Sequence, residues 1–173
     1  MALFMTAYLL LMQREGGYSW SKTDKGGETY KGISRKYNPN WEGWVVIDGA
    51  KTDPTFPKNL DSVFVLNDYV QSFYQVQWNL SKCGQFESQE IANAFFDAWV
   101  NQGDDWASRS LQTIVGVFPD GVMGQQTVQA VNWRDQNALL IDLKNVRETR
   151  YKQIAFADPT QEANLTGWLS RLA

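Results

Sequence analysis

Apolar residues recur at spacings of three and four residues along most of this chain, and this feature constrains the fold most. Such a period is typical of amphipathic helices that bury one face. The pattern is strongest from Asp61 to Trp78 and recurs within residues 88–103, 106–116, 127–131, 135–154 and 165–172. The sequence therefore predicts a mainly α protein.

The opening segment predicts a largely buried helix. Phe4 and Leu11 follow helical spacing and lead to Glu15, which is expected in the last turn before Gly16-Gly17 ends the helix. Residues 2–12 are apolar but lack the basic n-region and the cleavage site of a signal peptide, and they are too short to span a bilayer. We therefore expect synthesis in the cytoplasm and no stable insertion into a membrane.

Two segments break the helical period. Residues 18–34 are rich in Gly, Thr, Tyr and Ser, which favours a small β-hairpin or short strands. Residues 38–59 contain prolines together with Trp41 and Trp44, and they predict a long loop. The two tryptophans, and Trp20 before them, are interpreted either as loop anchors or as part of a sugar groove.

Composition excludes several kinds of site. The chain has 173 residues and no His, which argues against Ser-His-Asp and Cys-His nucleophiles in their usual forms and against an imidazole-based zinc amidase. The 16 Lys and Arg against 19 Asp and Glu give a net charge of −3, without the basic stripe that nucleic acid requires. No cluster has the spacing of a metal site, so no metal, cofactor or nucleic acid is expected.

Carboxylates must therefore perform any acid–base chemistry at neutral pH. Glu15 follows an apolar helix, and apolar surroundings disfavour the charged form of a carboxyl group, as a general acid requires. Asp24 lies nine residues later in a polar, Gly-rich segment, where it should stay ionised. Glu28 is the alternative second carboxylate, although an exposed hairpin position is the simpler interpretation. Two carboxylates in unlike surroundings suit glycosidic bond cleavage.

The residues around this pair resemble the signature of the glycosyl hydrolase family 108 N-acetylmuramidases. The matching elements are Glu15-Gly-Gly-Tyr18, Asp24-Lys-Gly-Gly27 and Thr29-Tyr-Lys-Gly-Ile33. Further similarity lies at Trp78, in Asp97, Asn101 and Gly103, and in Leu111-Gln112, Asp120-Gly121, Gly124 and Thr127. The last set is similar to the peptidoglycan-binding-like region of that family.

The resemblance implies a lysozyme-like helical fold in which the hairpin carries the Gly-rich segment of the active site. It implies a catalytic region over residues 1–84 and a helical peptidoglycan-binding-like region over 85–173, packed together as one compact unit. Glu15 would be the catalytic acid and Asp24 its partner. The other expected substrate contacts are Tyr18, Thr29, Tyr30, Asp97 and Asn101.

The implied activity is hydrolysis of the β-1,4 bond between N-acetylmuramic acid and N-acetylglucosamine in bacterial peptidoglycan. The chain would be a monomer of the endolysin type, reaching the cell wall through a holin or a secretion system. Two alternatives stay open. One is lytic transglycosylase action by Glu15 alone, and the other is a non-catalytic wall-binding or secretion-assisting protein.

Overall fold

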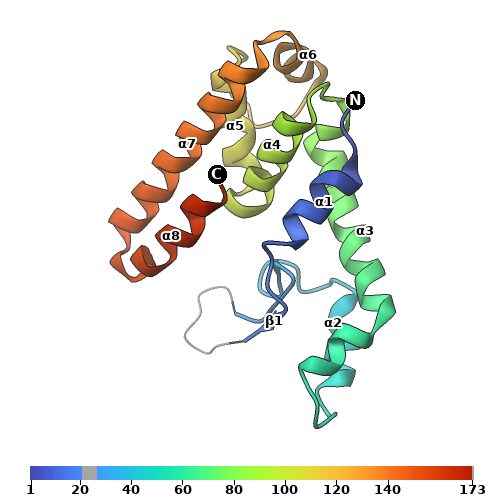
Figure 1. Cartoon of the computed structure of the whole chain (residues 1–173). Coiled ribbons are helices and arrows are strands. Elements are labelled where there is room, and N and C mark those ends of the chain that lie inside the picture. The colour runs from blue at the N-terminus through green and yellow to red at the C-terminus, as the bar shows by residue number, and fades with distance from the viewer. Residues whose placement is uncertain (21–26, 173) are drawn as a thin grey trace. The chain divides into compact units, whose positions relative to one another are not determined.

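The structure, a computed structural model, describes residues 1–20 and 27–172. These residues form a mainly α fold with one small sheet (Figure 1), which confirms the predicted fold class. The helices are α1 (Phe4–Met12), α2 (Gly43–Ala50), α3 (Phe64–Ser81), α4 (Gln89–Gln102), α5 (Asp104–Ile114), α6 (Gln125–Trp133), α7 (Gln136–Ala157) and α8 (Glu162–Ser170). Short 3-10 helices occupy Lys58–Ser62, Cys83–Gln85 and Pro159–Gln161.

Backbone packing divides the chain into two compact units. Unit 2 comprises Leu11–Val76, and unit 1 comprises Met1–Leu10 together with Gln77–Ala173. Unit 1 is therefore built from both ends of the chain, and the chain enters and leaves unit 2 within α1 and α3. The domain boundary expected after residue 84 stays a prediction.

Unit 1 is a helical assembly in which α4 packs against α5 and α7, while α7 and α8 lie side by side (Figure 1). Its helix ends are set by local chemistry. The hydroxyl of Ser88 accepts a hydrogen bond from the Ile91 N–H at 3.3 Å, and the Asp135 carboxylate accepts one from the Ala138 N–H at 2.8 Å. Between α4 and α5, Gly103 has a φ of 94°, a conformation that glycine adopts readily.

The first residues of the chain are tied into unit 1. The Ala2 N–H donates to the Phe86 carbonyl at 2.8 Å, and the Leu3 N–H donates to Gln89 Oε1 at 2.6 Å. The Phe4 ring lies 6.0 Å from that of Trp78. These contacts join the start of the chain to elements more than seventy residues away, so unit 1 needs both of its segments to complete its packing.

Unit 2 contains the sheet, whose antiparallel order is β1 (Tyr18–Ser19), β2 (Thr29–Tyr30) and β3 (Ile33–Ser34). Tyr30 pairs with Ile33, so only Lys31 and Gly32 connect β2 to β3. Both connecting residues have positive φ, at 44° and 80°, as in the type I′ turns that favour two-residue hairpins. The core of this unit includes Tyr30, Ile33, Trp44, Ile47, Leu60, Leu66 and Tyr74.

Two expectations about local structure are wrong. The first helix ends at Met12, before Gly16-Gly17, and it is not largely buried, since Leu9 on its outer face is 56% exposed. The loop expected over 38–59 contains α2, whose Trp44 and Ile47 face the core. This helix has two glycines, two adjacent β-branched valines and no side-chain hydrogen bond at its N-cap, so its sequence carries a weak helical signal.

Candidate active site

Glu15 lies just beyond α1. Its backbone N–H donates to the Leu11 carbonyl at 3.1 Å, and the Arg14 N–H reaches the same carbonyl at 3.0 Å. The chain therefore makes one more turn after the helix, although α1 itself has ended. Leu11 is buried and anchors this turn, whereas the Glu15 side chain is half-buried. The position combines a fixed backbone with a carboxyl group that solvent can still reach.

The Glu15 carboxyl group lies against the β2–β3 turn. A Cβ atom built on Gly32 would stand 2.6 Å from Glu15 Oε2 and 2.7 Å from the Tyr74 hydroxyl oxygen. No side chain fits there without displacing one of these groups, and the φ of 80° adds a second reason for glycine. Gly32 thus brings a carboxyl group and a phenol to the same point of the backbone.

Hydrogen bonds hold this turn in place. The Tyr74 hydroxyl, from buried Tyr74 on α3, donates to the Lys31 carbonyl at 2.8 Å. The Lys31 N–H donates to the Gly17 carbonyl at 3.3 Å, and the Lys31 ammonium donates to Asn67 Oδ1 at 2.9 Å. The turn is therefore fastened to Gly17, just before β1, and to α3, and these hydrogen bonds fix the surface that supports Glu15.

Glu28 is not the exposed hairpin residue that the sequence suggests, because its side chain is only 12% exposed. It accepts a hydrogen bond from the Tyr18 hydroxyl at 2.9 Å and from Arg35 Nη1 at 2.9 Å, and Lys51 Nζ lies 2.7 Å away. Burial alone would raise the pKa of Glu28, but the hydrogen bonds from Lys51, Arg35 and Tyr18 outweigh burial and lower the pKa. Glu28 is a fixed, ionised partner of two cations.

Asp48 completes the same cluster. Arg35 holds both of its carboxylate oxygens, at 2.7 and 2.6 Å, and Lys51 Nζ lies 2.7 Å from Oδ1. The hydrogen bonds from Arg35 and then Lys51 hold the pKa of Asp48 well below its usual range. We call Glu28, Arg35, Asp48 and Lys51 the charge cluster. It joins the start of β2 to α2.

The expected substrate contacts of unit 2 have different surroundings. Tyr18 is half-buried, with its hydroxyl on Glu28 and its ring edge-on to Phe56 at 4.7 Å. Thr29, on β2, is half-buried and pairs with Ser34 across the sheet. Tyr30 is 1% exposed and stacks with Trp41, so its ring is core and presents no open face to a sugar. Asp24 lies outside the described residues.

Asp97 and Asn101 belong to unit 1. The Asp97 side chain is 8% exposed and forms a buried ion pair with Arg147, while Arg171 Nη1 lies 3.3 Å from its second oxygen. The Asn101 amide donates to the backbone carbonyl of Asp97 at 2.9 Å. Asp97 therefore ties α4 to α7 and to the end of α8. Any contact of these two residues with a substrate stays a prediction.

The motif in the second half of the chain builds a fixed loop around a buried amide. Gln112, which is 1% exposed, donates to Asp120 Oδ1 at 2.7 Å and to the Val122 carbonyl at 3.0 Å. It also accepts from the Gly121 N–H at 2.9 Å. The side chain of Gln112 thus satisfies the polar groups of the Pro119–Val122 loop, which gives this motif a structural role.

The contacts that Tyr74 and Gly32 make around Glu15 could not be predicted from the sequence pattern. Tyr74 follows the same helical spacing as the core residues of α3, and its hydroxyl becomes important only because β2 and β3 return beside it. Gly32 is part of the signature, but its contact with Glu15 depends on the fold of the hairpin.

In the described chain, no helix is long and apolar enough to cross a membrane. The same residues include no group of three His, Cys, Asp or Glu that could hold a metal ion.

Comparisons with known proteins agree with this arrangement. The model of the family described as Glycosyl hydrolase 108 matches residues 8–103, and the model described as Predicted Peptidoglycan domain matches residues 106–173. The solved structure of SagA from Brucella abortus is similar, with a TM-score of 0.69 and 25% identity, covering 98% of this chain and 92% of that chain. A comparison with curated proteins found no match.

The matched residues contain Glu15, the β2–β3 turn and the charge cluster, and the lysozyme-like helical fold expected from the sequence is confirmed. More than half of the chain fits the first family model, and nearly all of the remainder fits the second. This chain belongs to the glycosyl hydrolase 108 family and is a glycoside hydrolase related to peptidoglycan.

Proposed function

We propose that this protein is an N-acetylmuramidase, which hydrolyses the β-1,4 bond between N-acetylmuramic acid and N-acetylglucosamine with Glu15 as general acid. The observation that carries the proposal is the Glu15 carboxyl group seated against Gly32, within the segment that matches the hydrolase family. A carboxyl group that protonates a leaving oxygen must be both fixed and accessible. Half-buried Glu15, on an anchored turn, satisfies both requirements.

In the proposed reaction, Glu15 donates a proton to the glycosidic oxygen as the bond to the sugar breaks. The positive charge that develops on the sugar ring needs a second carboxylate, either to stabilise it or to direct water. We assign this role to Asp24, on the family resemblance and on the spacing from Glu15.

Glu28 is a poorer candidate for the second carboxylate. Its oxygens already accept hydrogen bonds from Tyr18, Arg35 and Lys51, and its lowered pKa makes it a weak base. It also lies inside a charge cluster that would have to open before water or sugar reached it. The role that the structure supports for Glu28 is to hold β2 in place beside Tyr18.

Mass analysis of the products from purified peptidoglycan tests the proposal. The native protein should release reducing muramic acid ends, and Glu15→Gln should not, because the amide keeps the shape but cannot supply the proton. Glu87→Gln, at an exposed glutamate of unit 1, is the matched control and should act like the native protein. Anhydro ends in place of reducing ends would mean that the protein is a lytic transglycosylase and not a hydrolase. Intact glycan after treatment with native protein, on walls of several peptide types, would favour a wall-binding role without catalysis.

The family match to a peptidoglycan domain supports the cell wall as the partner of residues 106–173. We propose that the protein acts on the wall as a monomer after delivery by a holin or a secretion system. A wall-pelleting assay with Glu15→Gln protein tests wall binding separately from cleavage.

A further inference from the structure

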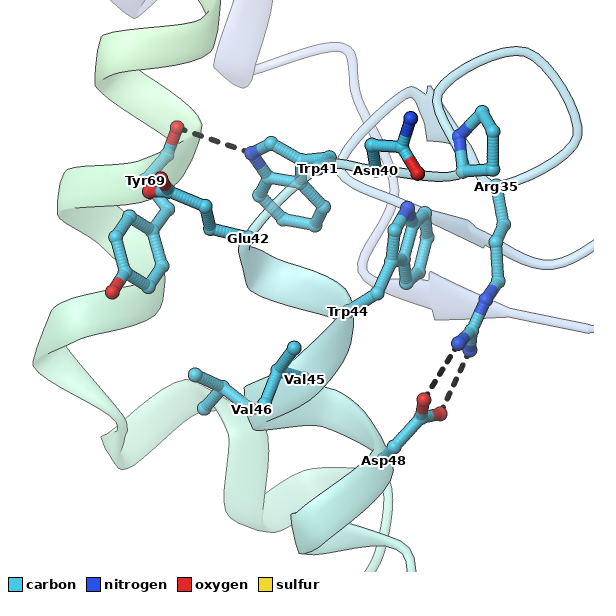
Figure 2. A pocket seen from close by; sticks show the side chains of 10 residues that line it. Arg35, Asn40, Trp41, Glu42, Trp44, Val45, Val46, Asp48 and Tyr69 are labelled. Atoms are coloured by element: carbon cyan, nitrogen blue, oxygen red, sulfur yellow. Dashed lines mark hydrogen bonds and ion pairs between the residues drawn. The ribbon is translucent and has the colours of Figure 1, made fainter.

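Unit 2 has a hollow of about 520 Å³ on the side of α2, lined by Tyr69 from α3 and otherwise by residues between Arg35 and Asp48 (Figure 2). Its volume lies in the range of roughly 300–1,000 Å³ that is usual for small-ligand sites. Glu15 is not among the described residues that line the hollow. The hollow is therefore separate from the carboxyl group assigned to catalysis.

The aromatic wall of the hollow is rigid. The Trp44 indole N–H donates to the Asn38 carbonyl at 2.8 Å, and the Trp41 indole N–H points to the Tyr69 carbonyl at 3.4 Å. The two indole rings meet edge-on at 5.1 Å. Both indole N–H groups are thus engaged inside the protein. Trp41 is partly exposed and presents apolar carbon surface to the hollow, whereas Trp44 is only 2% exposed and supports Trp41 from behind. Figure 2 shows the Tyr69 side chain next to Glu42, and the Trp41 indole N–H directed at the Tyr69 backbone carbonyl.

The rim of the hollow is polar and also fixed. Arg35 grips Asp48 with two hydrogen bonds, drawn in Figure 2, and its guanidinium group lies 5.2 Å from the centre of the Trp44 ring. Asn40 and Glu42 also line the hollow, and both are exposed. An amide and a carboxylate supply the hydrogen-bond donors and acceptors that sugar hydroxyl and acetamido groups need.

The charges of the lining select among cell-wall components. Arg35 and Asp48 neutralise each other as a bidentate pair, which leaves the Glu42 carboxylate as the net charge of the described lining. A ligand with a carboxylate or a phosphate would meet repulsion there. A neutral sugar that has an apolar face and hydroxyl groups would not.

We propose that this hollow is a second saccharide-binding site, which takes the neutral N-acetylglucosamine units of a glycan strand. Its ligand class rests on the proposed function, because peptidoglycan offers N-acetylglucosamine beside the anionic muramic sugar. The Tyr69 and Trp41 rings pack on the sugar's apolar face, and Asn40 and Glu42 bind its polar groups. Val45, which is 78% exposed, also lines the hollow.

The site is connected to the catalytic carboxyl group through one strand. The Trp41 ring stacks with Tyr30 at a centroid distance of 6.3 Å, and Tyr30 immediately precedes the Lys31-Gly32 turn that supports Glu15. Both sites therefore belong to unit 2 and to one continuous packing arrangement. A long strand held in the hollow stays attached to the unit that carries Glu15, whereas a short fragment does not gain this advantage.

The test uses full-length Glu15→Gln protein and the trimer of N-acetylglucosamine, so it measures binding whether or not the native protein cleaves peptidoglycan. Indole N–H signals of Trp41 and Trp44 should shift in two-dimensional NMR spectra as the trimer is added. Tyr69→Ala and Asn40→Ala should each weaken binding about tenfold or more, equal to about 1.4 kcal/mol. Tyr37→Ala, at an exposed tyrosine outside the hollow, should leave it unchanged.

A variant that blocks the hollow without unfolding the protein separates loss of binding from loss of folding. Val45→Arg places a long side chain at the hollow from an exposed position, and it should abolish the indole shifts while the thermal unfolding temperature stays near that of the parent. Val122→Arg, also at an exposed valine but in unit 1, is its matched control. Saturable trimer binding that leaves both indole signals and the Val45→Arg affinity unchanged would overturn the proposal, as would absence of trimer binding. Stronger shifts with an anionic muramyl peptide than with the trimer would overturn the neutral-sugar assignment.

Discussion

The Oε2 atom of Glu15 lies 2.6 Å from the point that a Cβ atom on Gly32 would occupy. The acidic side chain therefore rests on bare backbone, at a turn whose two residues both have positive φ. Glycine is needed at this position to form the turn and also to leave room for the carboxyl group. The geometry of the hairpin and the placement of the proposed acid are set by the same residue.

Gly32→Ala should damage both activity and stability. A left-handed conformation costs a residue with a Cβ atom about 1–2 kcal/mol, and the new methyl group must displace Glu15 or Tyr74. A displacement near 1 Å is expected to slow cleavage by about 10²-fold. Release of reducing ends and urea unfolding measure the two effects. Gly49→Ala in α2, where nothing lies within 4 Å of the new atom, should retain full activity.

Tyr74→Phe should weaken the support of the turn without removing a packed ring. The variant loses the hydrogen bond to the Lys31 carbonyl, which contributes about 0.5–1.5 kcal/mol in a typical case. We expect kcat to fall while binding of wall fragments stays close to normal, because the change acts on the position of Glu15. Tyr37→Phe, at an exposed tyrosine, should change neither quantity. Equal losses of kcat and of fragment affinity would contradict a positioning role.

Asp24→Asn and Glu28→Gln should separate the two candidate second carboxylates. If Asp24 aids water or stabilises charge, Asp24→Asn lowers cleavage by about 10²-fold or more. Glu28→Gln should instead reduce the free energy of unfolding, because it removes one of the two anions that Arg35 and Lys51 share. Cleavage rates measured at a temperature where each variant is folded distinguish these effects. Full activity of Asp24→Asn would shift the proposed mechanism to Glu15 alone.

The charge cluster predicts a loss of stability in acid. The pKa values of Glu28 and Asp48 are lower in the folded protein than in the unfolded chain, so the unfolded chain binds more protons as the pH falls. Their contribution is complete above the unfolded values, at about pH 4–4.5, and is lost as the pH falls through the folded values. Urea unfolding between about pH 3 and about pH 6 should show this decline, and Glu28→Gln should flatten it.

Asp97→Asn tests the buried ion pair of unit 1. It leaves the Arg147 charge buried without its counterion, and breaking such a pair typically costs about 3–5 kcal/mol. Asp142→Asn is the matched control, since Asp142 pairs with Arg134 at a partly exposed position, where about 0–1 kcal/mol is expected. The loss in the free energy of unfolding is measured for both variants and compared. Similar small losses in both variants would show that the Asp97 pair adds little to stability.

Long helices with a regular apolar face were predictable from the sequence. In α3, Leu66, Val70 and Tyr74 are buried at spacings of four residues, and in α7 Leu139, Leu143 and Arg147 follow the same rule. The period identifies the apolar members of such a face. It does not reveal that Arg147 is buried because Asp97, fifty residues earlier, neutralises it.

The candidate site was predictable as a motif but not as a geometry. The signature identifies Glu15 and Gly32, which are seventeen residues apart, yet their contact arises from strand register and two positive φ angles. Glu28 shows the same limit, because a glutamate in a polar hairpin has no local sign of the cations that surround it. Arg35 reaches it through the β2–β3 hairpin, where the Arg35 N–H donates to the Glu28 carbonyl at 2.8 Å. Lys51 reaches it only after α2 forms, and α2 itself has a weak local signal.

Unit 1 begins with the first residues of the chain and resumes only at Gln77. During synthesis, Ala2 and Leu3 leave the ribosome long before Phe86 and Gln89, which accept hydrogen bonds from their N–H groups. All residues of unit 2 are synthesised before Phe86 and Gln89, so unit 2 can fold first. The apolar first residues of the chain lack their packing partners during that time. Chaperone binding to nascent chains should therefore concentrate on that opening segment and end once α4 has emerged.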